Sequence, residues 1–203
     1  EYLKGFKPKY LLMIIVAVSY IALLYRYGIT LNNLKFMILI PMLLSAFLID
    51  LKLQIIPNRL TLTIFETGMI FTFISVILNV QTGINVFINN MLGMFVGAGI
   101  FLLITLIGGA IAGKEAMGFG DVKLMGAMGL FFGWINIILI SVMAFLFAAI
   151  VSIAILIMRR KKISEYIPFG PFIVASAFIT IYTPFSILLF VLLKIFSLGM
   201  FKG

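Results

Sequence analysis

The sequence contains no cysteine and no histidine, and only 10% of its 203 residues are charged. Without cysteine the chain has no disulfide and no thiol nucleophile. Without histidine it has no Ser-His catalytic pair, and the usual zinc ligand sets are missing too. Acidic residues are also scarce, with 6 Asp and Glu against 15 Lys and Arg. An enzyme of this composition must work with carboxylates, hydroxyls, amides or lysines.

Apolar residues take the place of the missing polar ones. The chain is 64% hydrophobic with a mean hydropathy of +1.29, whereas soluble domains are about 45–50% apolar and about 25% charged. This composition excludes an ordinary water-soluble domain and predicts a polytopic membrane protein. The net charge of +9 does not indicate nucleic-acid binding, because the basic residues lie in short gaps between apolar runs.

The uncharged runs predict an all-α transmembrane helix bundle with about seven hydrophobic segments, since a spanning helix needs about 20 mostly apolar residues. The expected segments are residues 10–25, 36–49, 60–79 and 86–111, two within 124–158, and one within 166–193. The run 124–158 is interrupted at 133–136, and Pro184 is expected to kink or end the last segment. We expect a single transmembrane domain over 1–203, with 1–9 as a basic tail.

The distribution of Lys and Arg predicts a cytoplasmic N-terminus. With that orientation the inner side carries eleven basic residues: Lys4, Lys7, Lys9, Lys52, Arg59, Lys114, Lys123, Arg159, Arg160, Lys161 and Lys162. The outer side carries only Arg26, Lys35, Lys194 and Lys202. Because short basic loops stay in the cytoplasm, loops 51–59, 112–121 and 159–167 are expected to face it.

Two acids are candidate functional groups. Asp50 ends one apolar segment and Asp121 begins another, at the same cytoplasmic depth in the predicted topology. Ionisable groups at membrane depth are costly and indicate function. Two carboxylates can hydrolyse a peptide, because one takes a proton from water while the other, protonated, polarises the scissile carbonyl. If Asp121 starts a helix and Asp50 ends one, helix dipoles favour an ionised Asp121 and a protonated Asp50.

Glycine and proline flank both acids. Pro57 is expected to start the helix that follows Asp50. The run Gly118-Phe119-Gly120 directly precedes Asp121, and its glycines permit the close backbone approach of an added substrate strand. Glu66 lies two turns beyond Arg59 on one helix face, where an ion pair with Arg59 or Lys52 is expected.

Three stretches of the chain together resemble the signature stretches of bacterial type IV prepilin peptidases. They are Ala46-Phe-Leu-Ile-Asp50-Leu-Lys-Leu-Gln-Ile-Ile-Pro57-Asn58, then Gly113-Lys-Glu-Ala-Met-Gly118-Phe-Gly120-Asp121-Val-Lys123-Leu124, then Ile167-Pro168-Phe169-Gly170-Pro171-Phe172. They occur in the family's order, and the resemblance extends from about residue 10 onward. It implies a GxGD-type intramembrane aspartic protease that removes the basic leader of prepilins and pseudopilins at the cytoplasmic face of the inner membrane. The family typically cuts after Gly and before Phe.

The resemblance also implies roles for particular residues. Asp50 and Asp121 match the family's catalytic aspartates. The residues that we expect to contact substrate are Pro57, Asn58, Gly118, Phe119, Gly120, Lys123, Pro168, Gly170 and Pro171. The expected partners are prepilin substrates and membrane lipids, without nucleic acid.

Larger family members also methylate the new amino terminus with S-adenosylmethionine, and carry a cysteine-bearing N-terminal domain. This sequence shows no such domain and no cysteine. We therefore expect peptidase activity without a cofactor, with S-adenosylmethionine used only if the native protein is bifunctional.

Two other classes of protein remain alternatives. A cation- or proton-coupled transporter would also use paired membrane acids, but near the bilayer midplane. A structural protein of the pilus platform would need no acid pair. For a peptidase, we expect the apolar helix of the pilin to dock on the small-residue faces Gly93–Gly99 and Gly126–Gly133, with its leader crossing 118–120 in extended form.

Overall fold

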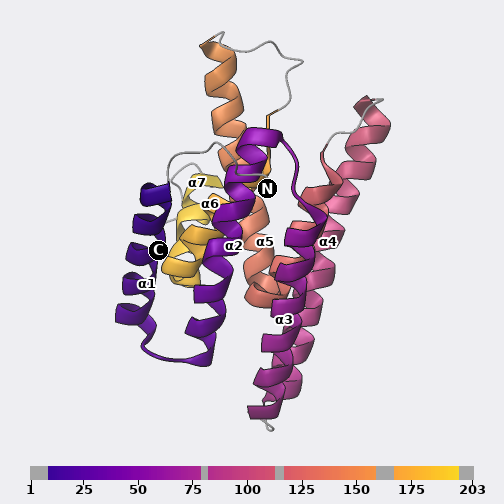
Figure 1. Ribbon diagram of the computed structural model, residues 1–203. Coiled ribbons are helices and arrows are strands. Elements are labelled where there is room, and N and C mark those ends of the chain that lie inside the picture. The colour runs from indigo at the N-terminus through magenta and orange to yellow at the C-terminus, as the bar shows by residue number, and fades with distance from the viewer. Residues whose placement is uncertain (1–8, 79–81, 113–116, 159–166, 197–203) are drawn as a thin grey trace.

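The computed structural model describes residues 9–78, 82–112, 117–158 and 167–196. Within these ranges the chain is all-α, as predicted, and forms seven helices (Figure 1). They are α1 (Lys9–Tyr27), α2 (Leu31–Leu53), α3 (Asn58–Leu78), α4 (Gly83–Ala112), α5 (Phe119–Ile157), α6 (Gly170–Tyr182) and α7 (Phe185–Phe196).

Four helices, α2 to α5, are long and apolar enough to cross a membrane. The other three are apolar but shorter. Lipid offers no hydrogen-bond partner for backbone N–H and C=O groups. Apolar runs therefore form helices, in which these groups bond to one another within the same segment. Two of the predicted segments lie within α5, and the last predicted segment is divided into α6 and α7 at Thr183 and Pro184, as expected for that proline.

The interruption predicted at 133–136 is a reversal of α5. Gly133 has φ 73° and ψ 172°, outside the helical region, and separates a first half, 119–132, from a second half, 134–157. The ammonium of Lys35 donates to the Phe131 carbonyl at 2.9 Å, and the Asn136 amide donates to the Phe132 carbonyl at 2.9 Å. These side chains satisfy carbonyls that the broken helix leaves without a partner. The second half then returns toward α6, where the Phe145 and Phe169 rings lie 5.0 Å apart.

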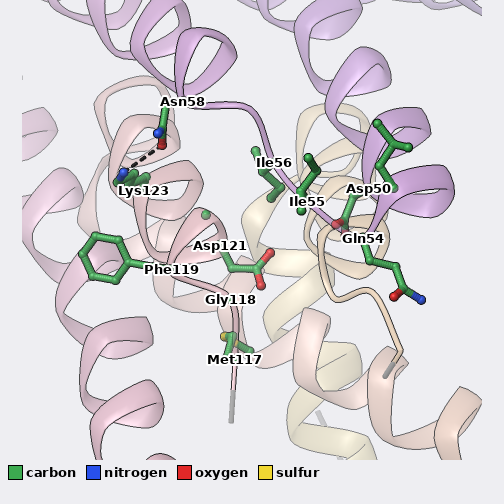
Figure 2. A pocket seen from close by; sticks show the side chains of 12 residues that line it. Asp50, Gln54, Ile55, Ile56, Asn58, Met117, Gly118, Phe119, Asp121 and Lys123 are labelled. Carbon is green, nitrogen blue, oxygen red and sulfur yellow. Dashed lines mark hydrogen bonds between the residues drawn. The ribbon is translucent and has the colours of Figure 1, made fainter. Parts of the chain in front are cut away.

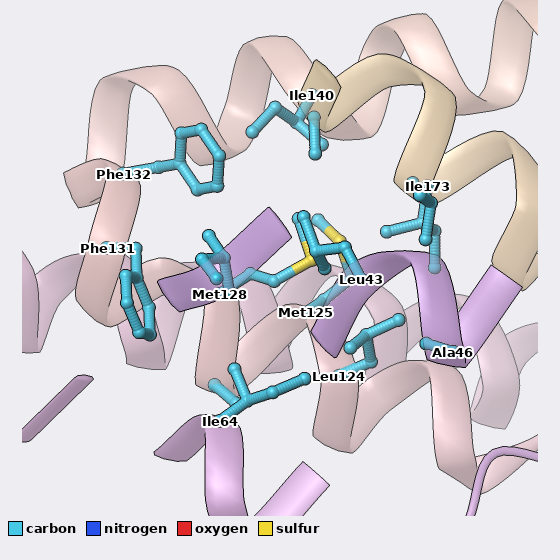
Figure 3. Packing of buried hydrophobic residues seen from close by; sticks show 14 of the residues in the cluster. Leu43, Ala46, Ile64, Leu124, Met125, Met128, Phe131, Phe132, Ile140 and Ile173 are labelled. Atoms are coloured by element: carbon cyan, nitrogen blue, oxygen red, sulfur yellow. The ribbon is translucent and has the colours of Figure 1, made fainter. Parts of the chain in front are cut away.

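The main core joins α2, α3, both halves of α5 and α6 (Figure 3). Its labelled side chains in that view are Leu43, Ala46, Ile64, Leu124, Met125, Met128, Phe131, Phe132, Ile140 and Ile173. Leu43, Ile64, Leu124 and Ile173 are all 0% exposed. This packing holds the last turn of α2 beside the first turn of α5, which brings Asp50 and Asp121 to the same end of the bundle.

Glycines allow α4 and the first half of α5 to pack backbone against backbone. A Cβ atom added at Gly97 would lie 2.6 Å from the Met125 carbonyl oxygen, and one at Gly93 or Gly129 would collide with the backbone of the other. Small residues permit such close contact between membrane helices. The expectation that a pilin helix docks on Gly93–Gly99 and Gly126–Gly133 is therefore wrong at Gly93, Gly97 and Gly129, because α4 and α5 cover these glycines.

Candidate active site

An open pocket of about 570 Å³ lies where the end of α2, the link to α3 and the start of α5 meet (Figure 2). Its lining residues are Asp50, Leu53, Gln54, Ile55, Ile56, Asn58, Met117, Gly118, Phe119, Gly120, Asp121 and Lys123. The structure thus brings together the two acids that the sequence selects, although 71 positions separate them. They approach the pocket from opposite walls, Asp50 on α2 and Asp121 on α5.

Asp50 is held by a residue from the far end of the chain. It lies in the last turn of α2 and is 3% exposed. Its Oδ2 accepts a hydrogen bond of 2.8 Å from the backbone N–H of Gly170, the first residue of α6. A Cβ atom at Gly170 would lie 2.6 Å from that Oδ2 and 3.0 Å from Cγ. Only glycine leaves room for the carboxylate against this helix end.

The backbone also bends sharply just after Asp50. Gln54 adopts a left-handed conformation with φ 56°, and its N–H donates to the Asp50 carbonyl at 2.8 Å. This arrangement ends α2, and the chain then runs without helical structure through Ile55 and Ile56 to Pro57. The Pro57 carbonyl accepts from the backbone N–H groups of Leu60 and Thr61. Pro57 thus marks the start of α3, but it lies one residue before the helix and not in its first turn, where it is expected.

Asp121 is the third residue of α5 and is 4% exposed. Gly118 caps this helix with extended backbone, and its carbonyl accepts from the Asp121 N–H at 3.0 Å. The Asp121 Oδ1 is buried and has no hydrogen-bond partner among the described residues. Asp121 lies close enough to Asp50 for the two carboxylates to interact electrostatically. A buried pair with a free oxygen can share a proton and bind a water molecule.

A second polar contact lies at the edge of the pocket. The Lys123 ammonium donates to Asn58 Oδ1 at 2.8 Å and lies 5.2 Å from the centre of the Phe119 ring (Figure 2). These contacts connect the start of α3 with the start of α5. They hold the Lys123 ammonium at the edge of the pocket.

The residues expected to bind substrate divide into two groups. Asn58, Gly118, Phe119, Gly120 and Lys123 line the pocket; Pro57, Pro168, Gly170 and Pro171 do not. Within the second group, Gly170 contacts Asp50 instead, and Pro171 is buried in the first turn of α6.

Five lining residues are not among those predicted from the sequence: Leu53, Gln54, Ile55, Ile56 and Met117. The one feature of the sequence that could have identified them is their place beside the two aspartates, within the stretches quoted above. By residue type, the apolar ones do not differ from the apolar residues elsewhere in the chain.

The expectation that the substrate leader crosses 118–120 as an added strand requires correction, because strand addition needs an extended backbone there. Only Gly118 is extended, with φ −67° and ψ 136°, while Phe119 and Gly120 form the first turn of α5. A Cβ atom at Gly120 would lie 3.1 Å from the Ile56 Cβ. Gly120 therefore packs α5 against the α2–α3 link.

Glu66 does not form the predicted ion pair. Its side chain is exposed on α3, and within the described part of the chain no salt bridge joins it to Arg59 or Lys52.

Several basic residues of the topology prediction lie outside the described residues, namely Lys4, Lys7, Lys114, Arg159, Arg160, Lys161, Lys162 and Lys202. Across the described ranges no three acidic side chains gather as a ligand set for a metal ion.

Comparison with known proteins agrees with this geometry. The Type IV leader peptidase family, Peptidase_A24, matches residues 37–153, a span that includes both aspartates. Curated relatives named prepilin leader peptidase/N-methyltransferase include those of Neisseria gonorrhoeae (30% identity), Legionella pneumophila (29%) and Aeromonas hydrophila (27%). The matches cover 76%, 81% and 74% of this chain and 50%, 55% and 49% of those proteins. The chain thus spans about half the length of the relatives it matches. No solved structure matches it.

Proposed function

The chain belongs to the type IV leader peptidase family, a family of aspartic proteases, and from that premise we propose that it removes the leader of type IV prepilins or pseudopilins. The scissile bond is the one after Gly and before Phe, at the cytoplasmic face of the inner membrane. One observation carries the proposal: two buried carboxylates, Asp50 and Asp121, line one open pocket at one end of an apolar helix bundle.

In the proposed reaction the two carboxyl groups share one proton. The ionised carboxylate takes a proton from a water molecule whose oxygen attacks the scissile carbonyl carbon, while the protonated carboxyl group donates a hydrogen bond to the carbonyl oxygen. When the C–N bond breaks, the leaving nitrogen takes the proton that the carboxylate removed from the water and becomes the amino terminus of the pilin. The leader leaves with a new carboxylate.

The surroundings of the pair support these roles. The Asp121 Oδ1 has no partner among the described residues and is available to the water. The Asp50 Oδ2 accepts the Gly170 N–H, so a proton on Asp50 would be carried by its Oδ1. Asp50 lies at the C-terminal end of α2 and also against the N-terminal end of α6. Because these helix ends have opposite effects, we assign the proton to the pair as a unit.

Orientation and localisation are part of the proposal. Three of the basic residues predicted to be cytoplasmic support this orientation: Lys52 and Arg59 flank the α2–α3 link, and Lys123 lines the pocket. A cytoplasmic pocket suits a substrate whose leader remains on that side while its apolar helix is in the membrane.

The proposal is tested by reconstituting the purified chain in liposomes with a prepilin and determining the product masses. We expect a leader that ends in Gly and a pilin that begins with Phe. A proton flux through the same liposomes without cleavage would instead favour a transporter. A parallel reaction with labelled S-adenosylmethionine measures methyl transfer to the new amino terminus, and we expect none from this 203-residue chain.

A further inference from the structure

An apolar groove extends from the candidate active site along the side of the bundle. It has a volume of about 580 Å³ and shares Asn58, Phe119 and Lys123 with the catalytic pocket. Its other lining residues are Thr61, Leu62, Phe65, Met94, Ala98, Leu102, Val122, Gly126 and Ala127. The polar groups lie at the shared end, and the deeper residues are apolar.

At the end opposite the pocket, α3 and α4 are in direct contact. There the Asn90 amide donates to the Thr72 hydroxyl at 3.0 Å, and the Phe73 and Phe87 rings lie 5.9 Å apart. Toward the pocket α4 diverges from α3, as Figure 1 shows. The first half of α5 forms the floor between them.

The lining residues follow helical periodicity on all three helices. The floor residues Phe119, Val122, Lys123, Gly126 and Ala127 repeat every three or four positions along α5, as residues on one helix face do. From Phe119 to Ala127 a helix rises about 12 Å, or roughly two turns. The groove is therefore long enough for about two turns of a second helix. It is also open at the side, because Leu62 is 54% exposed and Leu102 is 38% exposed.

We propose that this groove binds the first two turns of the apolar helix of the uncut prepilin, on the membrane side of the scissile bond. The inference rests on the proposed function. The occupant must be apolar over two turns and must continue into a segment that reaches Asp50 and Asp121, because the groove opens directly into their pocket. A membrane-embedded substrate helix that begins at its cleavage site meets both requirements, whereas a lipid acyl chain meets only the first.

Cross-linking tests the proposal directly, because the chain has no cysteine of its own. Leu62→Cys and Leu102→Cys place a single thiol on the α3 and the α4 wall of the groove. Each is combined with Asp121→Asn, which keeps the substrate uncut, and with a prepilin that carries one cysteine in the second turn of its helix. The matched controls are Ile70→Cys on α3 and Leu103→Cys on α4. Both control positions lie outside the groove lining, at 55% and 59% exposure.

We expect the two groove thiols to form the prepilin cross-link and the two controls to form little of it. Equal cross-linking at all four positions, or none at the groove, would overturn the assignment. A kinetic arm uses Leu102→Trp to fill the groove and Leu103→Trp as its control. Leu102→Trp should raise the KM for full-length prepilin roughly tenfold, because apolar side chains of the substrate lose their burial. Leu103→Trp should leave this KM unchanged, because Leu103 lies outside the groove lining.

These experiments distinguish an error in the proposed function from an error in the groove assignment. If wild-type chain does not cleave prepilin, the proposed function is wrong and the groove assignment falls with it. If wild-type chain cleaves prepilin but Leu102→Trp leaves the KM for full-length prepilin unchanged, only the groove assignment is wrong.

Discussion

Replacing Gly170 with alanine should damage catalysis without unfolding the protein. The added Cβ would lie 2.6 Å from the Asp50 Oδ2, whereas ordinary contact begins near 3.4 Å, so the carboxylate must move by about 0.8 Å. The same movement distorts the 2.8 Å hydrogen bond from the Gly170 N–H. Helix α6 itself should tolerate the change, because alanine favours a helix more than glycine does.

The size of the effect follows from this displacement. Misplacing a catalytic group by about 1 Å can cost about 100-fold in rate, so we expect kcat to fall roughly 10- to 100-fold. The KM should change little, because Gly170 does not line the pocket.

The assay measures kcat and KM for prepilin cleavage, together with the thermal unfolding of each purified variant. Gly99→Ala is the matched control, because a Cβ atom there meets nothing within 4 Å. A folded Gly170→Ala protein with wild-type kcat would refute the positioning role that we assign to Gly170.

Three further predictions use other parts of the structure. Gly97→Val should lower the free energy of unfolding by about 1–3 kcal/mol, because it overpacks the α4–α5 contact. Gly99→Val should lower it less, because a Cβ atom there has open space; thermal unfolding of the two variants measures the difference. Lys123→Met should reduce activity severalfold and Asn58→Leu by a similar factor, with no further loss in the double variant, because the two side chains share one hydrogen bond. Cleavage should persist in EDTA and after thiol reagents, and a loss that added metal restores would contradict a carboxylate mechanism.

Much of the fold could be predicted because membrane helices leave a direct mark in the sequence. Uncharged runs located the segments, and Gly133 and Pro184 marked real breaks. The two aspartates stood out because acids are rare in such runs and these two share a depth. Each of these inferences needed only local sequence and the cost of polar groups in lipid.

The remaining features depend on tertiary packing. Gly170 looked like a residue of a substrate groove, yet it contacts Asp50, 120 positions away. The glycines on α4 and α5 carry the same spacing whether a helix packs within the protein or against a partner, so sequence could not distinguish the two. The groove between α3 and α4 arises from the divergence of two helices, which no residue pattern marks.

The most direct test of the central claim is the single-turnover rate of leader release by Asp50→Asn, Asp121→Asn and the double variant, each confirmed as folded. Catalytic groups that act as one unit are strongly non-additive, so losing one costs about as much as losing both. Because Asp50 and Asp121 act as one unit, each single variant should fall to the rate of the double variant. A single variant that cleaves prepilin at the wild-type rate would contradict it.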